Sequence, residues 1–291
     1  VLGTLNKGYA IAIRYNQRRD AAAAARNFIL AYRVLGDYGK ALAAIREAER
    51  PLGEVGLGQV GSISYISSVQ VFALLGKAAE SEFFSRAETL LGKAESVGNA
   101  ISLGHYHMCY STYHQLRLQN KEALSSAEKG LAFFKKAEDR DDIALAHIQK
   151  GILLASLGDL KTAARNIARA TKIYDAIHCE YLKPMLMLGR GMVARCAGAE
   201  DARQILSEGL RASKKMGTRE ITWQIQRELA LYHRDRGEYH KALGYFQDAV
   251  EMLKQITETL DEEELKVSYL ETPLRKRIFD EIKELRKQTR Q

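Results

Sequence analysis

The sequence predicts an all-α protein, a right-handed solenoid in which antiparallel helix hairpins stack on one another. Of its 291 residues 46% are hydrophobic, which is enough for a continuous core, and only three are prolines. Because each proline removes a backbone donor and disrupts a helix interior, this composition favours long helices. The alternating Val, Ile and Thr residues that are typical of strands are not evident. A helix-turn-helix pattern also recurs about every 40 residues.

The recurring unit is a turn followed by a helix rich in small residues. Clear copies read LGDYGKALAAIREA from Leu35, LGDLKTAARNIARA from Leu157 and RGEYHKALGYFQDA from Arg236. Weaker copies begin at Leu75, Arg117 and Cys196. The predicted turn residues are Gly36, Gly76, Leu118, Gly158, Gly198 and Gly237. Their spacing of about 40 residues is that of a helix-hairpin repeat.

These residues resemble the tetratricopeptide repeat, in its longer form of about 40 residues. In the fourth copy Gly151 matches the small residue at which the two helices touch, and Ala163, Ile167 and Ala170 match the small-large-small pattern of the second helix. Small residues at a crossing let helix axes approach closely. The resemblance covers nearly the whole chain, although the family's proline after the second helix is absent from every copy except at Pro51.

The period also divides the chain, which we interpret as a single solenoid over 1–291. About six repeats occupy 17–258. The segment 1–16 is expected to be the second helix of a truncated repeat or, alternatively, a simple amphipathic cap, so the chain is interpreted as a fragment. The segment 259–291 is expected to form a capping helix, which a solenoid needs to cover its last apolar face. Pro273 is expected to kink or split that helix.

One glycine-rich stretch has the spacing of a dinucleotide-binding loop. Gly56 to Gly61 reads GLGQVG, but that fingerprint requires a preceding strand in a βαβ unit. Here the preceding segment is helical, and we expect it to end at Pro51. We therefore interpret GLGQVG as a junction between two repeats, with no cofactor.

Neither the histidines nor the cysteines predict a metal site or catalytic chemistry. His105 and His107 are two apart, so they point to different faces of a helix. Cys109, Cys179 and Cys196 are odd in number and widely spaced, without a C-x-x-C pair. We expect no enzyme activity, no metal and no disulfide framework. A reducing, cytoplasmic location fits this cysteine usage, and no apolar run approaches the roughly 20 residues needed to cross a membrane.

The resemblance implies a concave surface lined by the first helix of each repeat. We call the small residue at which the two helices of a repeat touch the contact residue. In each first helix, the residues expected to line the concave surface lie three positions before it, one position after it and four positions after it. The candidate partner-binding residues are Arg26, Arg33, Gln70, Met108, Thr112, Gln115, Met192, Arg195, Arg227 and Arg234. Arginine forks would hold the carboxylates of an acidic peptide, and methionine suits an adaptable groove. Alternatively, these arginines interact favourably with the helix dipole at the C-terminal ends of the helices, and the methionines belong to the core.

The formal net charge of +8 does not by itself select a function. Its signs are interleaved along most of the chain, which is typical of solvated helix faces. The function we predict is a non-catalytic protein-protein interaction module that binds a partner peptide or domain in its concave groove. The repeats are similar to segments of bacterial signalling proteins and transcription regulators, and to eukaryotic polarity scaffolds.

The alternative is a nucleic-acid-binding or transcription-regulator domain that uses the basic surface. The shortage of helices with charge of a single sign, and of aromatics interleaved with Lys and Arg, argues against nucleic acid. The partner's identity, any lost effector domains, homo-oligomer formation and the use of the groove or the convex face remain open.

Overall fold

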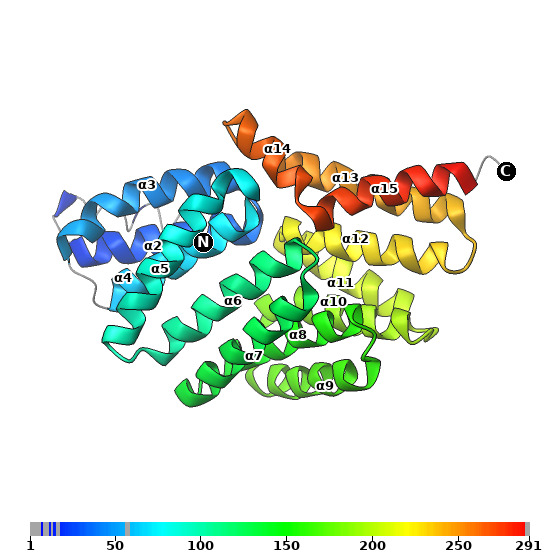
Figure 1. The fold of residues 1–291 in the computed structure, drawn as a ribbon, viewed down its shortest axis with the longest axis horizontal. Coiled ribbons are helices and arrows are strands. Elements are labelled where there is room, and N and C mark those ends of the chain that lie inside the picture. Colours follow the sequence, from blue (N-terminus) through cyan, green and yellow to red (C-terminus); the bar gives the residue numbers. More distant parts are fainter. Residues whose placement is uncertain (1–6, 8–11, 13, 16–17, 56–58, 289–291) are drawn as a thin grey trace.

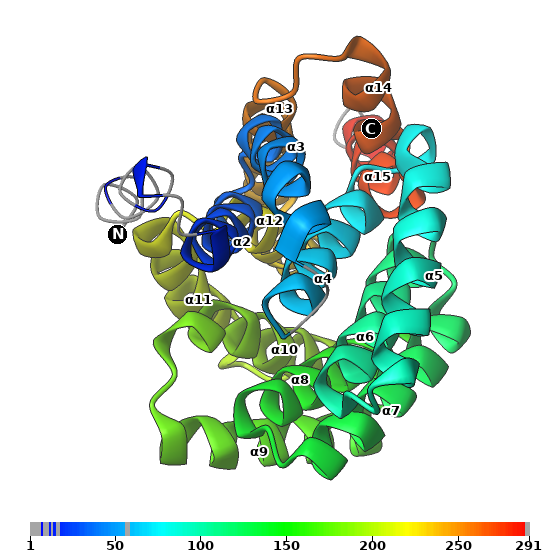
Figure 2. The same cartoon turned by 90° about the vertical axis from the view of Figure 1, so that its left-hand side faces the viewer.

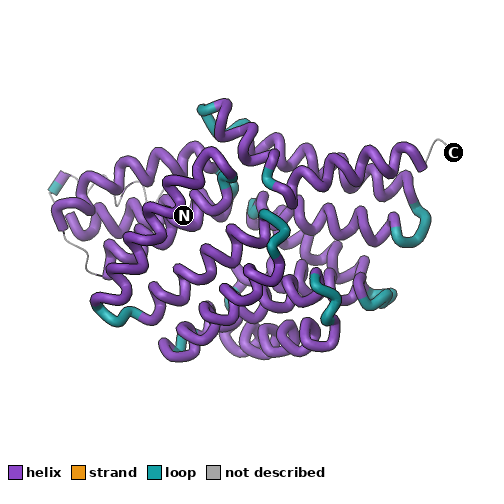
Figure 3. The backbone as a smooth tube through the Cα atoms, viewed as in Figure 1, coloured by secondary structure: helices purple, strands orange, loops and turns teal. Residues whose placement is uncertain are grey.

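Figure 1 shows the computed structural model of the protein, which describes residues 7, 12, 14–15, 18–55 and 59–288. These residues form helices and turns, with no strand among them (Figure 3). The all-α solenoid predicted from the sequence is therefore confirmed. The predicted segment 1–16 lies almost entirely outside the described residues.

Helices follow one another as hairpins, which stack in the order of the sequence. Six hairpins pair α2 (Arg18–Leu35) with α3 (Tyr38–Val55), α4 (Gln59–Leu74) with α5 (Glu80–Ser96), α6 (Ala100–Leu116) with α7 (Asn120–Ala137), α8 (Arg140–Ser156) with α9 (Leu160–Ile177), α10 (Lys183–Cys196) with α11 (Ala202–Met216) and α12 (Arg219–Arg234) with α13 (Tyr239–Thr257). Short 3-10 turns, η1 (Lys77–Ala79) and η2 (Glu180–Leu182), precede α5 and α10. Two further helices, α14 (Glu263–Glu271) and α15 (Pro273–Gln288), follow the last hairpin.

The turns inside the hairpins fall where the sequence predicts them. All six predicted turn residues have a positive φ: Gly36, Gly76, Leu118, Gly158, Gly198 and Gly237. The left-handed backbone ends the first helix of each pair, and glycine adopts it without a steric penalty. Leu118 adopts φ 60° without that advantage, which explains why this copy is hard to recognise in the sequence.

Side-chain caps fix where several helices begin. The Asp139 carboxylate accepts from the Asp142 amide at 3.1 Å, and the Asp159 carboxylate accepts from the Thr162 amide at the same distance. The Asn99 side chain accepts from the Ser102 amide at 3.1 Å. Each cap satisfies a backbone donor that the first turn of a helix leaves without a partner.

Within a hairpin, glycines let the two helices touch. A Cβ added at Gly151 would lie 2.5 Å from the Ile167 side chain, and one added at Gly191 would lie 2.4 Å from Leu206. These are the small and large partners that the repeat pattern predicts. The large side chain fills the groove left by the glycine, so the hairpin packs without a void.

Proline has different effects at Pro273 and at Pro51. Pro273 is the first residue of α15 and separates it from α14, so the predicted capping helix is split in two. Pro51, expected to end its helix, lies within α3, which continues to Val55. That expectation was wrong because the packing of α3 on α2 outweighs the loss of one backbone hydrogen bond.

The glycine stretch GLGQVG lies between two helices. Its residues 56–58 are outside the described part of the chain, and α4 begins directly afterwards at Gln59. The helix α3 precedes the stretch, whereas a dinucleotide-binding loop would follow a strand.

The two ends of the solenoid meet and close it into a ring (Figure 2). One buried apolar cluster takes members from α2, α3 and α4 at one end and from α12, α13, α14 and α15 at the other. Its fully buried members include Ile29, Tyr38, Trp223, Phe246 and Tyr269. The closing contact is therefore part of the hydrophobic core.

We call the contact between the two ends of the solenoid the seam. Backbone amides also form hydrogen bonds across it. The Tyr38 amide donates to the Thr259 hydroxyl at 3.1 Å, and the Ala78 amide donates to the Ser268 hydroxyl at 2.8 Å. The backbones approach so closely at Gly39 that an added Cβ would lie 1.8 Å from the Thr259 carbonyl oxygen. The seam therefore admits no side chain at this position.

Replacing Gly39 by alanine should destabilise the protein. The new methyl group forces the seam apart, and overpacking of this kind costs about 1–3 kcal/mol. The matched control is Gly92→Ala in α5, where an added Cβ meets nothing within 4 Å. There the substitution should stabilise the helix by up to about 1 kcal/mol. Urea denaturation followed by the fluorescence of the single tryptophan measures both variants, and equal effects would contradict the seam contact.

Candidate functional site

Closure of the ring encloses a central chamber of about 230 Å³. Every hairpin contributes to its wall through its first helix or the turn that precedes that helix. The lining residues are Arg33 and Val34 on α2, Gln70 and Leu74 on α4, Met108, Cys109, Thr112 and Gln115 on α6, Leu145, Gln149 and Ile152 on α8, Tyr181, Leu182, Met185 and Leu188 at η2 and α10, and Thr218, Glu220, Ile221 and Gln224 at α12.

Five of the ten candidate residues come together in this chamber. They are Arg33, Gln70, Met108, Thr112 and Gln115. They originate from three different hairpins, so only the superhelical stacking of the repeats brings them together. Sequence periodicity thus identified one side of the chamber.

Arg33 is a half-buried cation without an ionic partner in the described part of the chain. Its Nε atom is buried and has no hydrogen-bond acceptor. Burial lowers the pKa of the guanidinium from its ordinary value, but arginine stays charged in proteins. The chamber therefore contains a positive charge that nothing within it neutralises.

Amide side chains face the chamber from four helices. They belong to Gln70, Gln115, Gln149 and Gln224. The Gln149 amide donates to the Gln115 side-chain carbonyl at 2.9 Å, and the Gln224 amide donates to the Glu220 backbone carbonyl at 2.9 Å. Each primary amide has two donor hydrogens and a carbonyl acceptor, so this wall offers both donors and acceptors to a ligand.

Two weakly acidic groups beside Arg33 do not provide a counter-charge. Burial raises the pKa of the Cys109 thiol to about 12. Burial also raises the pKa of the Tyr181 phenol, as do its neighbours Cys179 and Asp141. Both groups are therefore neutral at pH 7 and leave the Arg33 charge uncompensated.

The Glu220 carboxylate lies where the chamber wall meets the seam. It accepts hydrogen bonds from the Tyr38 hydroxyl at 2.9 Å and the Tyr269 hydroxyl at 2.7 Å. The Trp223 indole donates to it at 2.5 Å, and Arg275 Nη2 donates at 2.8 Å. These four donors come from α3, α12, α14 and α15, so one carboxylate ties both ends of the chain together.

We call Glu220 and its four donors, Tyr38, Trp223, Tyr269 and Arg275, the hub. The Arg275 side chain is fully buried. Its Nη1 donates to the Leu74 carbonyl at 2.8 Å and the Tyr269 carbonyl at 3.0 Å, and its guanidinium lies 3.5 Å from the centroid of the Tyr269 ring. Burial alone would lower the pKa of Arg275, but the charge of Glu220 leads the causes that raise it. Burial and the Glu220 charge raise the pKa of Tyr38 well above its usual range. Both groups therefore stay protonated donors.

Two other candidate arginines are bound to carboxylates of the same chain. Arg195 Nε donates to Glu228 at 2.8 Å and its Nη1 to Asp235 at 3.1 Å. Arg227 pairs bidentately with Glu281 on α15, at 2.6 and 3.1 Å. These guanidinium groups connect helices of the solenoid. An acidic partner would have to displace internal ligands to reach them.

Two further candidates, Met192 and Arg234, lie apart from the chamber. Met192 and Arg227 line a smaller adjoining cavity of about 50 Å³. Arg234 is about one-third exposed and pairs with its neighbour Asp235 at 3.1 Å. Arg26 lies in α2, and its side chain is outside the described part of the chain.

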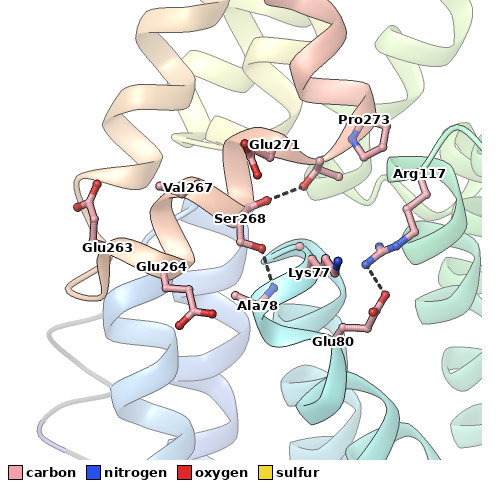
Figure 4. Close-up of a pocket in the computed structure, with 12 residues that line it drawn as sticks. Lys77, Ala78, Glu80, Arg117, Glu263, Glu264, Val267, Ser268, Glu271 and Pro273 are labelled. Carbon is pink, nitrogen blue, oxygen red and sulfur yellow. Dashed lines mark hydrogen bonds and ion pairs between the residues drawn. The ribbon is translucent and has the colours of Figure 1, made fainter.

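A wider, shallower cavity of about 910 Å³ lies outside the ring, between η1 and α14 (Figure 4). Glu263, Glu264 and Glu271 form one wall, while Lys77 and Arg117 stand opposite. Arg117 pairs with Glu80 at 3.0 Å on its own side of the cavity. Glu263 and Glu264 occupy the first turn of α14, where the helix dipole favours negative charge.

Sequence reasoning missed part of the chamber because it counted only three positions per helix. Relative to the contact residue, Leu145, Met185 and Gln224 lie six before, and Cys109 and Gln149 lie two before. The positions six before extend the same face by one helical turn, and the positions two before lie on that face between the counted ones, so a fuller count would have found them. Tyr181 comes from η2, which breaks the helical period, and the pattern carries no signal for it.

In the described residues no group of three or more His, Cys, Asp or Glu side chains could hold a metal ion. His105 pairs with Asp142 at 2.9 Å, and His147 pairs with Asn166 at 2.9 Å. Burial lowers the pKa of His147, which favours its neutral form. None of the helices in the described part of the chain is long and apolar enough to cross a membrane.

Comparison with known proteins supports the fold. No family model matches the chain, and no curated protein matches it. Among solved structures it resembles a Rap protein complexed with competence and sporulation factor, with a TM-score of 0.60 and 12% identity over 92% of this chain and 74% of that one. It also resembles aspartyl phosphate phosphatase F from Bacillus subtilis, with a TM-score of 0.56 and 15% identity over 95% of this chain and 74% of that one.

Replacing Arg275 by methionine should open the seam. The change leaves Glu220 without its cationic partner, and breaking a buried pair in this way costs about 3–5 kcal/mol. Arg277→Met is the matched control, because that side chain is 58% exposed and pairs weakly with Glu281 at 3.4 Å; its effect should stay below about 1 kcal/mol. Urea denaturation followed by circular dichroism measures both. Equal stability of the two variants would rule out the hub as the closing interaction.

Proposed function

We propose that this chain is a non-catalytic interaction module that binds a peptide segment of a partner in its central chamber. One observation carries the proposal: the first helices of all six hairpins, or the turns before them, converge on one chamber. A ligand there contacts residues that are far apart in the sequence. Its binding energy is therefore coupled to the arrangement of the whole solenoid.

The lining suits a peptide better than a nucleic acid. Apolar side chains such as Leu74, Ile152 and Leu188 alternate with glutamine amides around the wall. Amide groups match the donors and acceptors of a peptide backbone, while the apolar groups receive its side chains. Arg195 and Arg227, which would attract phosphates on the concave face, are already paired with Glu228 and Glu281.

The chamber is accessible from outside. Tyr181 lines it and is nevertheless 49% exposed. The wall at η2 therefore reaches the surface, and a ligand enters there without dismantling the hub around Glu220. The methionines Met108 and Met185 also line the chamber and adjust readily to different side chains.

The name of one similar structure supports this proposal. It is a Rap protein in complex with competence and sporulation factor, so a protein of similar fold forms a complex with that factor. The other is named an aspartyl phosphate phosphatase. For this chain we propose no catalysis. Burial raises the pKa of the Cys109 thiol to about 12, the described lining residues include no histidine or lysine, and the Glu220 carboxylate is occupied by its four donors. A regulatory role in the cytoplasm agrees with three unpaired cysteines.

Filling the chamber should abolish peptide binding. Peptides are first selected against the wild-type chain from a random library, and their affinity is then measured by fluorescence anisotropy. Thr112→Trp places an indole in the chamber and should weaken binding at least about tenfold, a loss of about 1.4 kcal/mol.

The matched control is Thr89→Trp on the outer helix α5. Both threonine hydroxyls donate to the carbonyl one turn earlier, at 3.2 Å for Thr112 and 2.9 Å for Thr89. The control should bind like the wild type. Undiminished binding by a folded Thr112→Trp variant would place the peptide site elsewhere.

A further inference from the structure

We infer that the chamber contains an anion subsite at Arg33, which selects a ligand with one carboxylate on a compact apolar body. The inference rests on the proposed function and names the chemistry that the site recognises. A free small carboxylic acid and the carboxyl end of a peptide share this chemistry, and the experiment below separates them.

The charges that line the chamber do not balance. Among its described lining residues, Arg33 and Glu220 are the groups that carry charge at pH 7. Glu220 is saturated by its four donors in the hub. Arg33 has no ionic partner among the described residues, its buried Nε has no acceptor there, and the thiol of Cys109 beside it stays neutral. The uncompensated charge is thus +1, which one carboxylate neutralises.

The position of Arg33 is unfavourable for the stability of the folded protein. A cation removed from water without a partner destabilises the folded protein. The dipole of α2 favours a basic residue in its last turn, where Arg33 lies. However, the dipole does not require the Nε atom to be buried. A solvent-exposed arginine would serve the dipole equally well, so the burial of Arg33 is explained by a ligand and not by the helix.

The size and the lining of the chamber suit a small ligand. About 230 Å³ is below the usual range of roughly 300–1,000 Å³ for drug-sized ligands. It holds a carboxylate and one medium apolar side chain. Leu145, Ile152 and Met185 supply the apolar contact, and the Gln70 and Gln115 side chains lie on the wall beside them. The guanidinium fork then pairs with the carboxylate in the bidentate manner that arginine favours.

Two probes that differ only in charge test the inference. N-acetyl-leucine carries the carboxylate, and N-acetyl-leucinamide is its neutral counterpart. Binding to the full chain is measured by ligand-observed NMR titration. The acid should bind at least about tenfold more tightly than the amide, because a hydrogen bond to a charged group is stronger than a neutral one.

Variants assign the preference to Arg33. Arg33→Gln should bind the acid and the amide equally, and Arg33→Lys should retain part of the preference. Arg234→Gln removes a cation outside the chamber and should behave like the wild type. Equal binding of acid and amide by the wild type would overturn the inference, as would a preserved preference in Arg33→Gln or the absence of binding by either probe.

Thermal unfolding without ligand gives a second readout. Since the Nε atom of half-buried Arg33 has no acceptor among the described residues, Arg33→Gln should raise Tm by about 2 °C or more. A lower Tm would show that Arg33 has a structural role instead and would contradict the subsite.

A leucine-terminated pentapeptide, with a free or an amidated end, identifies the source of the carboxylate. Tighter binding of the free-ended peptide than of N-acetyl-leucine indicates a peptide terminus, and equal binding indicates a small acid; both support the subsite. If the library peptides bind but are insensitive to charge at Arg33, the subsite is wrong while the proposed function stands. If no peptide binds at all, the proposed function fails as well.

Discussion

The carboxylate of Glu220, whose side chain is only 12% exposed, is the constraint on which the rest of the structure depends. A row of helix hairpins has two free ends, and nothing in the repeat itself makes them meet. Here Tyr38 from the first hairpin and Tyr269 and Arg275 from the last two helices donate to the same carboxylate. Because a buried charge must be fully paired, this hub fixes the curvature of the solenoid. The apolar cluster around it then completes the closure.

Closure determines which charges remain for a ligand. Arg195 and Arg227, which lie on the inner helices, are paired with carboxylates of the chain, and their role is to hold α10, α12 and α15 together. Arg33, near the hub but not part of it, has no ionic partner in the described part of the chain, and its buried Nε has no acceptor there. The same geometry therefore stabilises the ring and leaves one cation in its chamber.

Most of the fold could be predicted from the sequence, because the turn positions and the small residues at helix crossings repeat with the chain. Gly151 opposite Ile167 is an example in which a local pattern specifies a contact. Half of the candidate site residues line the chamber for the same reason. Ring closure could not be predicted, since it depends on the Glu220 and Arg275 pair, 55 residues apart, which follows no period. The pairing of Arg227 with Glu281 was hidden for the same reason.

Cross-linking across the seam tests the central claim, that the chain alone forms a closed ring. The 2.8 Å bond from the Ala78 amide to the Ser268 hydroxyl keeps the two Cα atoms within about 7 Å, close to the reach of a disulfide. In the double variant Ala78→Cys and Ser268→Cys, mild oxidation of the monomer should therefore produce this disulfide, identified by peptide mass spectrometry, without any ligand. Two freely reactive thiols and no cross-link in the folded monomer would contradict the closed ring.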